Sequence, residues 1–191
     1  MLIQVDVDST LYDANVLFAE VAKEHFGIEL PLDAGNWYDY NDVADTLTLH
    51  RIFRKSHSRE YVEKQIPFEG AADCLKFCRE KGHEVVFISD RHAQARNTLL
   101  KWLKDNNFTE HEGFGTNAQV IAGLDKRTWM KKHTPDVVID DRVRTMFLAR
   151  SWNAHVFALE CPWNVNLKKE IDGIHICKNW TEIASKLDKI I

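Results

Sequence analysis

The sequence has few cysteines, and none of them stands in a metal-binding spacing. The four are Cys74, Cys78, Cys161 and Cys177. They form no Cys-x-x-Cys pair and no spacing typical of a zinc site, so a structural zinc module is disfavoured. Cysteines used in this way fit a reducing compartment, and we expect a cytoplasmic protein.

Long apolar runs and an excess of positive charge are also missing. No apolar run approaches the roughly 20 residues that a membrane-spanning helix needs, and we expect no membrane partner. Asp6 and Asp8 interrupt the N-terminal segment, so we expect no signal peptide. The formal net charge is −4, whereas a protein that binds a long polyanion usually presents a basic surface. A long nucleic acid is therefore disfavoured as the main ligand, although a local basic pocket remains compatible with the sequence.

Several common catalytic and nucleotide-binding motifs are absent. The pair Gly113-Phe-Gly115 lacks the third glycine of a dinucleotide-binding loop, and no Walker loop occurs. The nine histidines form no His-Glu-x-x-His motif, and there is no Gly-x-Ser-x-Gly elbow. The sequence thus gives no support to these nucleotide-binding, metalloprotease or serine-hydrolase chemistries.

Short apolar runs alternate with amphipathic segments along most of the chain. Hydrophobic periodicity predicts helices over 15–26, 42–55, 61–66, 71–81, 96–106, 126–133, 144–151 and 181–190, the last with Thr181 as its N-cap. After the N-terminal strand, it predicts strands over 84–89, 111–116, 136–139, 154–159 and 173–177. This alternation indicates an α/β fold with a mainly parallel sheet. The stretch 15–67 has no predicted strand, so we expect a small helical cap inserted after the first strand of a core formed by 1–14 and 68–191.

Polar side chains follow three of the predicted strands where each strand ends. They are Asp6 and Asp8, Ser89 and Asp90, and Asp140 and Asp141. Ligands of open parallel sheets bind beyond the carboxyl ends of the strands, so we expect these groups to share one site. Two carboxylates one residue apart project from the same side of a strand and repel each other unless a cation compensates them. Their hard oxygen ligands favour Mg²⁺.

These residues match an ordered set of motifs. The set is Asp6-Val-Asp8-Ser-Thr10, then Val-Val-Phe-Ile-Ser89, then a lysine, then Val-Val-Ile-Asp140-Asp141. It resembles the four motifs of the haloacid dehalogenase-like phosphatase superfamily, and the resemblance covers nearly the whole chain. It implies a Rossmann-like three-layer sandwich. One departure is Ser9, where the family usually has glycine and where the backbone must make a tight turn.

A narrower resemblance points to one branch of that superfamily. The helical insert, the Ile-Ser-Asp-Arg91 run, the Ile-Asp-Asp-Arg142 run and the later Cys161-Pro-Trp-Asn164 are similar to the 5'(3')-deoxyribonucleotidases. This resemblance implies a deoxynucleoside monophosphate as substrate. Trp163, within the last motif, either borders the site or only packs.

The resemblance assigns a role to each acidic residue. Asp6 is the expected nucleophile, which attacks phosphorus to give an aspartyl-phosphate. Asp8 is the expected general acid for the leaving oxygen and then the general base for the hydrolytic water. The expected Mg²⁺ ligands are Asp6, the backbone carbonyl of Asp8, and a carboxylate of Asp140 or Asp141. The other member of that last pair is expected to hold the lysine.

The phosphate is expected to meet polar groups from two further segments. Ser89 would donate its hydroxyl group to a phosphate oxygen, helped by the backbone N–H of Asp90. Lys126 is the preferred cation because it opens the helix that leads into the strand before Asp140, whereas Lys131 and Lys132 lie toward the far end of that helix.

The helical insert holds the candidate substrate contacts. Aromatic side chains stack on nucleobases, and the candidates are Trp37, Tyr38, Tyr40 and Phe53, together with Arg91. The alternative is that the aromatic residues form the small core of the insert itself.

The sequence therefore predicts a magnesium-dependent phosphomonoesterase that acts on a nucleoside monophosphate, most readily a 5'(3')-deoxyribonucleotide. A phosphatase for another small phosphate ester, or for 3'-phosphate ends of nucleic acid, is the enzymatic alternative. A phospho-accepting signalling module, or a nucleotide-binding protein without turnover, is the alternative of another class. The sequence also leaves a homodimer open.

Overall fold

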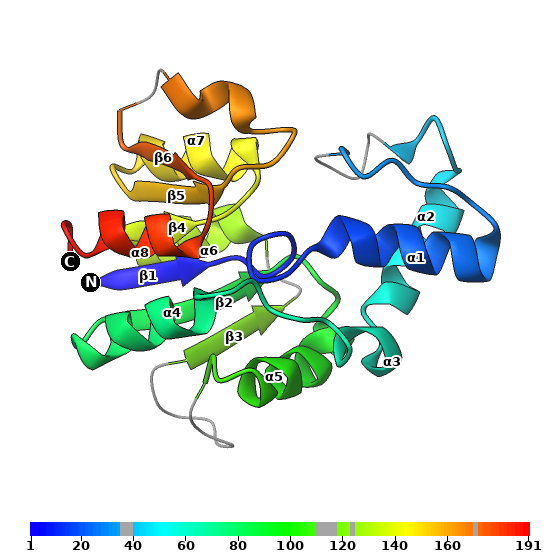
Figure 1. Ribbon diagram of the computed structural model, residues 1–191, viewed down its shortest axis with the longest axis horizontal. Coiled ribbons are helices and arrows are strands. Elements are labelled where there is room, and N and C mark those ends of the chain that lie inside the picture. The colour runs from blue at the N-terminus through cyan, green and yellow to red at the C-terminus, as the bar shows by residue number, and fades with distance from the viewer. Residues whose placement is uncertain (35–39, 110–117, 123–124, 170–171) are drawn as a thin grey trace.

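The computed structural model describes residues 1–34, 40–109, 118–122, 125–169 and 172–191. Its centre is a parallel sheet of six strands in the order β3-β2-β1-β4-β5-β6 (Figure 1). The strands are β1 (Leu2–Val5), β2 (Glu84–Ser89), β3 (Ala118–Ala122), β4 (Val137–Ile139), β5 (His155–Leu159) and β6 (Ile174–Cys177). All five pairings between neighbouring strands are parallel, which confirms the predicted α/β class.

Helices α4 (Ala71–Glu80), α5 (Arg96–Asp105) and α8 (Trp180–Leu187) cover one face of the sheet, and α6 (Lys126–His133) and α7 (Val143–Ser151) cover the other. The remaining helices are α1 (Ala14–Phe26), α2 (Thr46–Ser56) and α3 (Arg59–Val62), and there are 3-10 turns η2 (Ala93–Ala95) and η3 (Val165–Lys169). Alternate side chains of β2 show the two faces. Val85 and Phe87 pack in one cluster with α4, α5 and α8, whereas Val86 and Ile88 pack in a second cluster with α6 and α7. The three-layer sandwich is therefore confirmed.

The central position of β1 brings the predicted acids together. Val5 pairs with Ile139 of β4, and the backbone N–H of Asp6 donates to the carbonyl of Ile139 at 2.8 Å. Asp6 and Asp140 therefore leave the sheet side by side. Because every strand is parallel, the loops after β1, β2 and β4 all emerge at the same edge.

The segment between β1 and α4 is helical where the structure describes it. It contains α1, α2 and α3, which lie beyond the carboxyl end of β1 (Figure 1). Rings of Phe18 in α1 and Phe53 in α2 meet edge to face, with centroids 4.5 Å apart. At the base of the segment, the backbone N–H of Phe68 donates to the carbonyl of Leu11 at 2.7 Å, so its two connections to the sheet lie next to each other.

Some element boundaries differ from the prediction. Thr181 is not the N-cap of the last helix, because α8 begins at Trp180 and the side chain of Asn179 accepts a hydrogen bond from the N–H of Glu182. In place of the helix predicted over 61–66, the structure has the shorter helix α3, which begins earlier in the chain. The predicted strand over 111–116 lies outside the described residues, and the strand in that part of the sheet is β3.

Among the residues that the structure describes, none of the helices combines the length and the apolar character needed to cross a lipid bilayer.

Candidate active site

A cavity of about 310 Å³ lies beyond the carboxyl ends of the central strands. Its lining includes Asp6, Asp8 and Asp141 from the loops after β1 and β4, and Asp90 and Arg91 from the loop after β2. The rest of its wall comes mainly from α1, α2 and neighbouring loops. This volume is at the lower end of the range for small-molecule sites.

A buried lysine holds two of the acids. The Nζ atom of Lys126 donates to Oδ1 of Asp6 at 2.6 Å and to Oδ2 of Asp140 at 2.7 Å. Burial alone would lower the pKa of Lys126, but the carboxylates of Asp140 and Asp6 raise it well above its usual range. Burial raises the pKa of Asp6 to about 6, against the opposing effect of Lys126. The cation is thus permanently charged, and it lies against the expected nucleophile.

Asp140 and Asp141 are neighbours with different partners. Both oxygens of Asp140 are engaged, since Oδ2 accepts from Lys126 and Oδ1 accepts from the backbone N–H of Arg142 at 3.0 Å. Oδ1 of Asp141 is buried and has no hydrogen-bond partner within the described parts of the chain. Burial, and then the charges of Asp6 and Asp140, raise the pKa of Asp141 well above its usual range. One oxygen from each of Asp6, Asp140 and Asp141 lies within 4.8 Å of the others, an arrangement that a divalent cation would relieve.

Asp8 is fixed by a different set of groups. Its Oδ1 atom accepts from the Tyr12 hydroxyl at 2.6 Å and from Nη2 of Arg91 at 2.7 Å, and its Oδ2 accepts from Nε of Arg91 at 3.0 Å. Although burial opposes it, the Arg91 cation holds the pKa of Asp8 far below its usual range. The structure therefore places Arg91 against Asp8 as well as in the cavity lining. Nη1 of Arg91 is buried and lacks a hydrogen-bond partner among the described residues.

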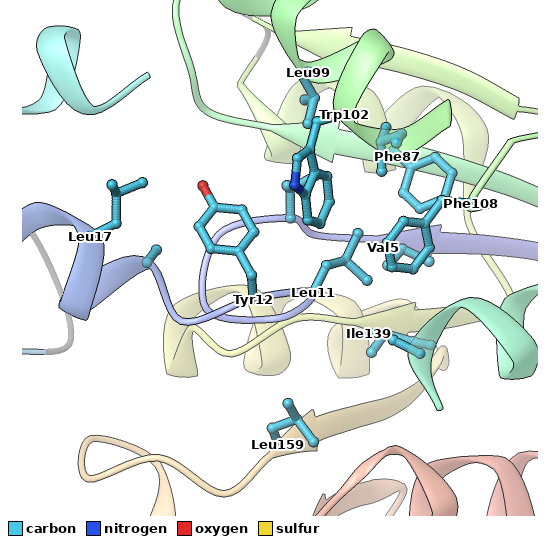
Figure 2. Packing of buried hydrophobic residues seen from close by; sticks show 14 of the residues in the cluster. Val5, Leu11, Tyr12, Leu17, Phe87, Leu99, Trp102, Phe108, Ile139 and Leu159 are labelled. Carbon is cyan, nitrogen blue, oxygen red and sulfur yellow. The ribbon is translucent and has the colours of Figure 1, made fainter. Parts of the chain in front are cut away.

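Tyr12 connects this cluster to the core. Its ring packs edge to face on Trp102 of α5, with centroids 5.2 Å apart, and Trp102 stacks on Phe108 (Figure 2). The position of the hydroxyl that meets Asp8 is therefore set by large buried rings. Sequence reasoning did not identify Tyr12, because only the folded chain shows that a tyrosine four residues after Asp8 turns back toward it.

Ser89 and Asp90 lie near the acids but differ in exposure. The Ser89 side chain is fully buried, its hydroxyl lies 3.5 Å from Oδ2 of Asp8, and it accepts from the N–H of Arg91 at 3.2 Å. Asp90 lines the cavity and pairs with Arg142, with 2.5 Å between Oδ2 and Nη1. The structure thus brings both residues to the predicted edge of the sheet.

The loop after β5 is tied to the metal-ligand candidates. Nε1 of Trp163 donates to the carbonyl of Asp141 at 3.0 Å, and Trp163 also lines the cavity. Asn164 is fully buried and donates to the carbonyls of Asp141 at 3.2 Å and Leu159 at 2.9 Å. Trp163 therefore both borders the site and supports it, which resolves the choice that the sequence left open.

Ser9 makes the tight turn that the motif requires without being glycine. Its φ angle is 57°, in the left-handed region that non-glycine residues seldom adopt. The side chain is largely buried and lines the cavity. Ser9 therefore adopts the left-handed conformation for which glycine was expected.

The helical segment supplies aromatic rings to the cavity. Phe53, Tyr40 and Phe18 all line it, and the rings of Tyr40 and Phe53 have centroids 5.9 Å apart. Trp37 and Tyr38, the other two aromatic candidates, lie outside the described residues. Tyr40 and Phe53 therefore both pack within the segment and face the site.

His57 also reaches this cavity from the helical segment. Its Nε2 atom lies 3.8 Å from Oδ2 of Asp8. Burial and the nearby Arg91 cation lower the pKa of His57 to about 3, so the imidazole is neutral at pH 7. Sequence reasoning did not identify this residue, since no motif or spacing distinguishes it from the other histidines.

Comparison with known proteins adds evidence on the fold. No family model and no curated protein sequence matches the chain. A HAD family hydrolase from Deinococcus radiodurans R1, solved with bound phosphate and sodium, superposes with a TM-score of 0.65 at 17% identity, covering 98% of this chain and 95% of that one. A haloacid dehalogenase-like family protein from Streptococcus pneumoniae gives 0.68 at 13%, covering 97% of each chain. A hydrolase from Pseudomonas syringae gives 0.68 at 15%, covering 100% of each. The chain therefore has the fold of the haloacid dehalogenase-like hydrolases.

Proposed function

We propose that the protein is a phosphomonoesterase that works through an aspartyl-phosphate on Asp6. The observation that carries this proposal is the environment of Asp6. Its side chain lines the cavity beyond the carboxyl ends of β1 and β4, its Oδ1 atom lies 2.6 Å from Nζ of the buried Lys126, and Asp141 is beside it. A cation and a metal-binding carboxylate next to a nucleophile are what charge stabilisation in phosphoryl transfer requires. The fold shared with known hydrolases supports the same reading.

The charges around the cavity fit one divalent cation. The carboxylates are Asp6, Asp8, Asp90, Asp140 and Asp141, and the cations paired with them are Lys126, Arg91 and Arg142. When all five acids are ionised they exceed the three cations by two charges, and the free Oδ1 of Asp141 provides a ligand atom. We propose that Asp6, Asp141 and the backbone carbonyl of Asp8 bind Mg²⁺, while Asp140 holds Lys126. Bound there, Mg²⁺ would neutralise carboxylate and phosphate charge.

The chain's own residues would then carry the reaction in two displacements. A carboxylate oxygen of Asp6 attacks phosphorus, the phosphorus–oxygen ester bond breaks, and the leaving oxygen takes a proton from Asp8. Water then attacks phosphorus, Asp8 takes a proton from it, and the bond to Asp6 breaks to release inorganic phosphate. Lys126 stays beside Asp6 throughout, with Ser89 and the N–H of Asp90 proposed as donors to the phosphoryl oxygens.

The general-acid step requires a change at Arg91. In the structure Arg91 keeps Asp8 ionised. An incoming phosphate dianion competes with Asp8 for this guanidinium and adds a like charge, and both effects raise the pKa of Asp8. We therefore propose that Arg91 passes from Asp8 to the substrate, and its unpartnered Nη1 is a further donor for that purpose.

For the substrate, we propose a nucleoside monophosphate, most readily a 5'(3')-deoxyribonucleotide. In this proposal residues 15–67 form a cap over the core, 1–14 and 68–191, and Tyr40 and Phe53 offer ring faces to the base. The support is the small cavity with acids at its floor and aromatic rings in its wall. The resemblance of the Cys161–Asn164 loop to that branch agrees with it.

The test is phosphate release from 5' and 3' monophosphates of deoxy- and ribonucleosides, with and without Mg²⁺. We expect Mg²⁺-dependent release that favours deoxynucleotides and is abolished in Asp6→Asn, because an amide cannot attack phosphorus. Asp42→Asn, an exposed acid of the helical segment, is the control and should keep full activity. Turnover by Asp6→Asn would contradict the mechanism. Activity on an aryl phosphate but on no nucleotide would keep the mechanism and discard the substrate.

A further inference from the structure

His57 is a buried polar side chain whose hydrogen bonds are not accounted for. It lies at the C-terminal end of α2, its side chain is 11% exposed, and it lines the same cavity as Asp6 and Asp8. Neither ring nitrogen has a hydrogen-bond partner among the residues that the structure describes. Leaving a buried donor unpaired is unfavourable, so such a group in a folded protein calls for an explanation.

The geometry places His57 close to the carboxyl group that would transfer protons. Its Nε2 atom is 3.8 Å from Oδ2 of Asp8, just beyond hydrogen-bond reach. Its ring packs edge-on against Phe18 of α1, with centroids 5.7 Å apart, which fixes it within the helical segment. A movement of about 1 Å would bring Nε2 and Oδ2 to hydrogen-bond distance.

Asp8 would need a new partner during the reaction. Arg91 donates to both oxygens of Asp8 in the structure, and the proposed transfer of Arg91 to the substrate removes both bonds. Tyr12 would remain on Oδ1. The hydroxyl of Ser89, 3.5 Å from Oδ2, is assigned to the phosphate. His57 is then placed to supply the missing donor at Oδ2.

We propose that His57 is a positioning residue for Asp8: when substrate draws Arg91 away, Nε2–H of His57 donates to Oδ2 and orients the carboxyl group toward the leaving oxygen. The inference rests on the proposed function, since it takes the proton-transfer role of Asp8 from it. It also gives the helical segment a part in the chemistry, because His57 directly follows α2 whereas Asp8 follows β1.

The test compares two leaving groups by kcat/KM in the presence of Mg²⁺. Thymidine 5'-monophosphate leaves as an alkoxide that needs a proton, whereas 4-nitrophenyl phosphate leaves as a stable anion that does not. His57→Asn should lower kcat/KM for the nucleotide by on the order of ten- to a hundredfold, and for the aryl ester by less than about threefold. His57→Gln carries its amide nitrogen near the position of Nε2 and should retain the wild-type ratio of the two substrates.

A double variant separates positioning from a merely structural role. Adding His57→Asn to Asp8→Asn should cause no further loss, because residues that act as a unit are not additive. His25→Asn, at a histidine of α1 that contacts Tyr61 outside the cavity lining, is the matched control and should keep the wild-type ratio of the two substrates. Melting curves of the Asn and Gln variants check that both fold.

Two results would overturn the role of His57: equal losses for both substrates in His57→Asn, or an additive loss in the double variant. Failure of the proposed function has a different signature. If the wild-type protein released no phosphate from either ester, the proposed function would be refuted before any His57 variant is made. An Asp8→Asn variant that lowers kcat/KM equally for both esters would remove the acid role of Asp8, and with it the basis for this inference, because kcat/KM reports the first displacement and not the later water step.

Discussion

Asp140 and Asp141 show how much the partners of a residue decide what it can do. They are consecutive and chemically identical, and both are buried. Asp140 pairs with Lys126 and accepts a hydrogen bond from a backbone N–H, while Asp141 keeps a carboxylate oxygen without a partner among the described residues. The first is therefore suited to hold the lysine, and the second to bind a metal ion.

This division predicts different effects of the two amide substitutions. Mg²⁺ at a hundred times its dissociation constant should stabilise the wild-type fold by about 2.7 kcal/mol, and Asp141→Asn should lose most of that gain. Asp140→Asn breaks a buried ion pair with Lys126, and it should lower the unfolding free energy by about 3 kcal/mol even without metal. Thermal melts of both variants, with Mg²⁺ and with a chelator, measure the two effects. A full Mg²⁺ shift in Asp141→Asn, with none in Asp140→Asn, would reverse the assignment.

At the scale of elements, the site depends on one loop that supports another. The loop after β5 reaches the loop after β4 through Asn164, which donates to the carbonyls of Asp141 and Leu159 and accepts from the N–H of Cys161 at 2.9 Å. The bond to Asp141 links the Cys161–Asn164 motif to the acidic loop after β4, the bond to Leu159 links it to the end of β5, and the bond from Cys161 closes the motif on itself. The motif therefore acts as a brace for the candidate metal ligand.

Removing this brace should weaken both the fold and the metal site. Asn164→Ala leaves buried backbone groups unpaired, so we expect a loss of about 2 kcal/mol in unfolding free energy. It should also raise the Mg²⁺ concentration needed for half-maximal phosphate release. Denaturant unfolding and a Mg²⁺ titration of activity give the two values. Asn97→Ala, on the exposed face of α5, should change neither; an unchanged Mg²⁺ requirement in Asn164→Ala would show that the brace serves stability alone.

The strand ends could be predicted from the sequence, but the contacts of the helical segment could not. Runs such as Val85–Ser89 are short, apolar and followed by polar residues, and parallel strands must bring such ends to one edge. His57 and Tyr12 carry no comparable signal, since their positions depend on how α1, α2 and α5 pack. Asn179 and Thr181 are both good capping residues, and only the path of the chain into α8 decides between them.

At the scale of the whole molecule, the proposed substrate site is a cavity between the sheet and the helical segment. The cavity of about 310 Å³ has the acidic loops of the sheet on one side and helices α1 and α2 on the other. A net charge of −4 gives the surface no general attraction for a polyanion. Both features favour a small phosphate ester over the end of a nucleic-acid chain.

This predicts a preference by size. A deoxynucleoside 3'-monophosphate should be hydrolysed with a kcat/KM at least about a hundredfold above that of an oligodeoxynucleotide with a 3'-phosphate, because the longer chain must displace the helical wall. Phosphate release from the two substrates at equal concentration of ends measures the ratio. Equal rates would favour the nucleic-acid alternative instead.

The hydrogen bond between Phe68 and Leu11 has a consequence for how such a protein can change. The helical segment leaves and re-enters the core at adjacent points. A replacement segment of another length or sequence therefore has only to bring its two ends together over that short distance. The carboxylates of the site and Lys126 belong to the core and lie outside that segment. A segment of different selectivity could thus replace this one while the residues of the reaction stay in place, and His57 would be a residue that the replacement must supply again.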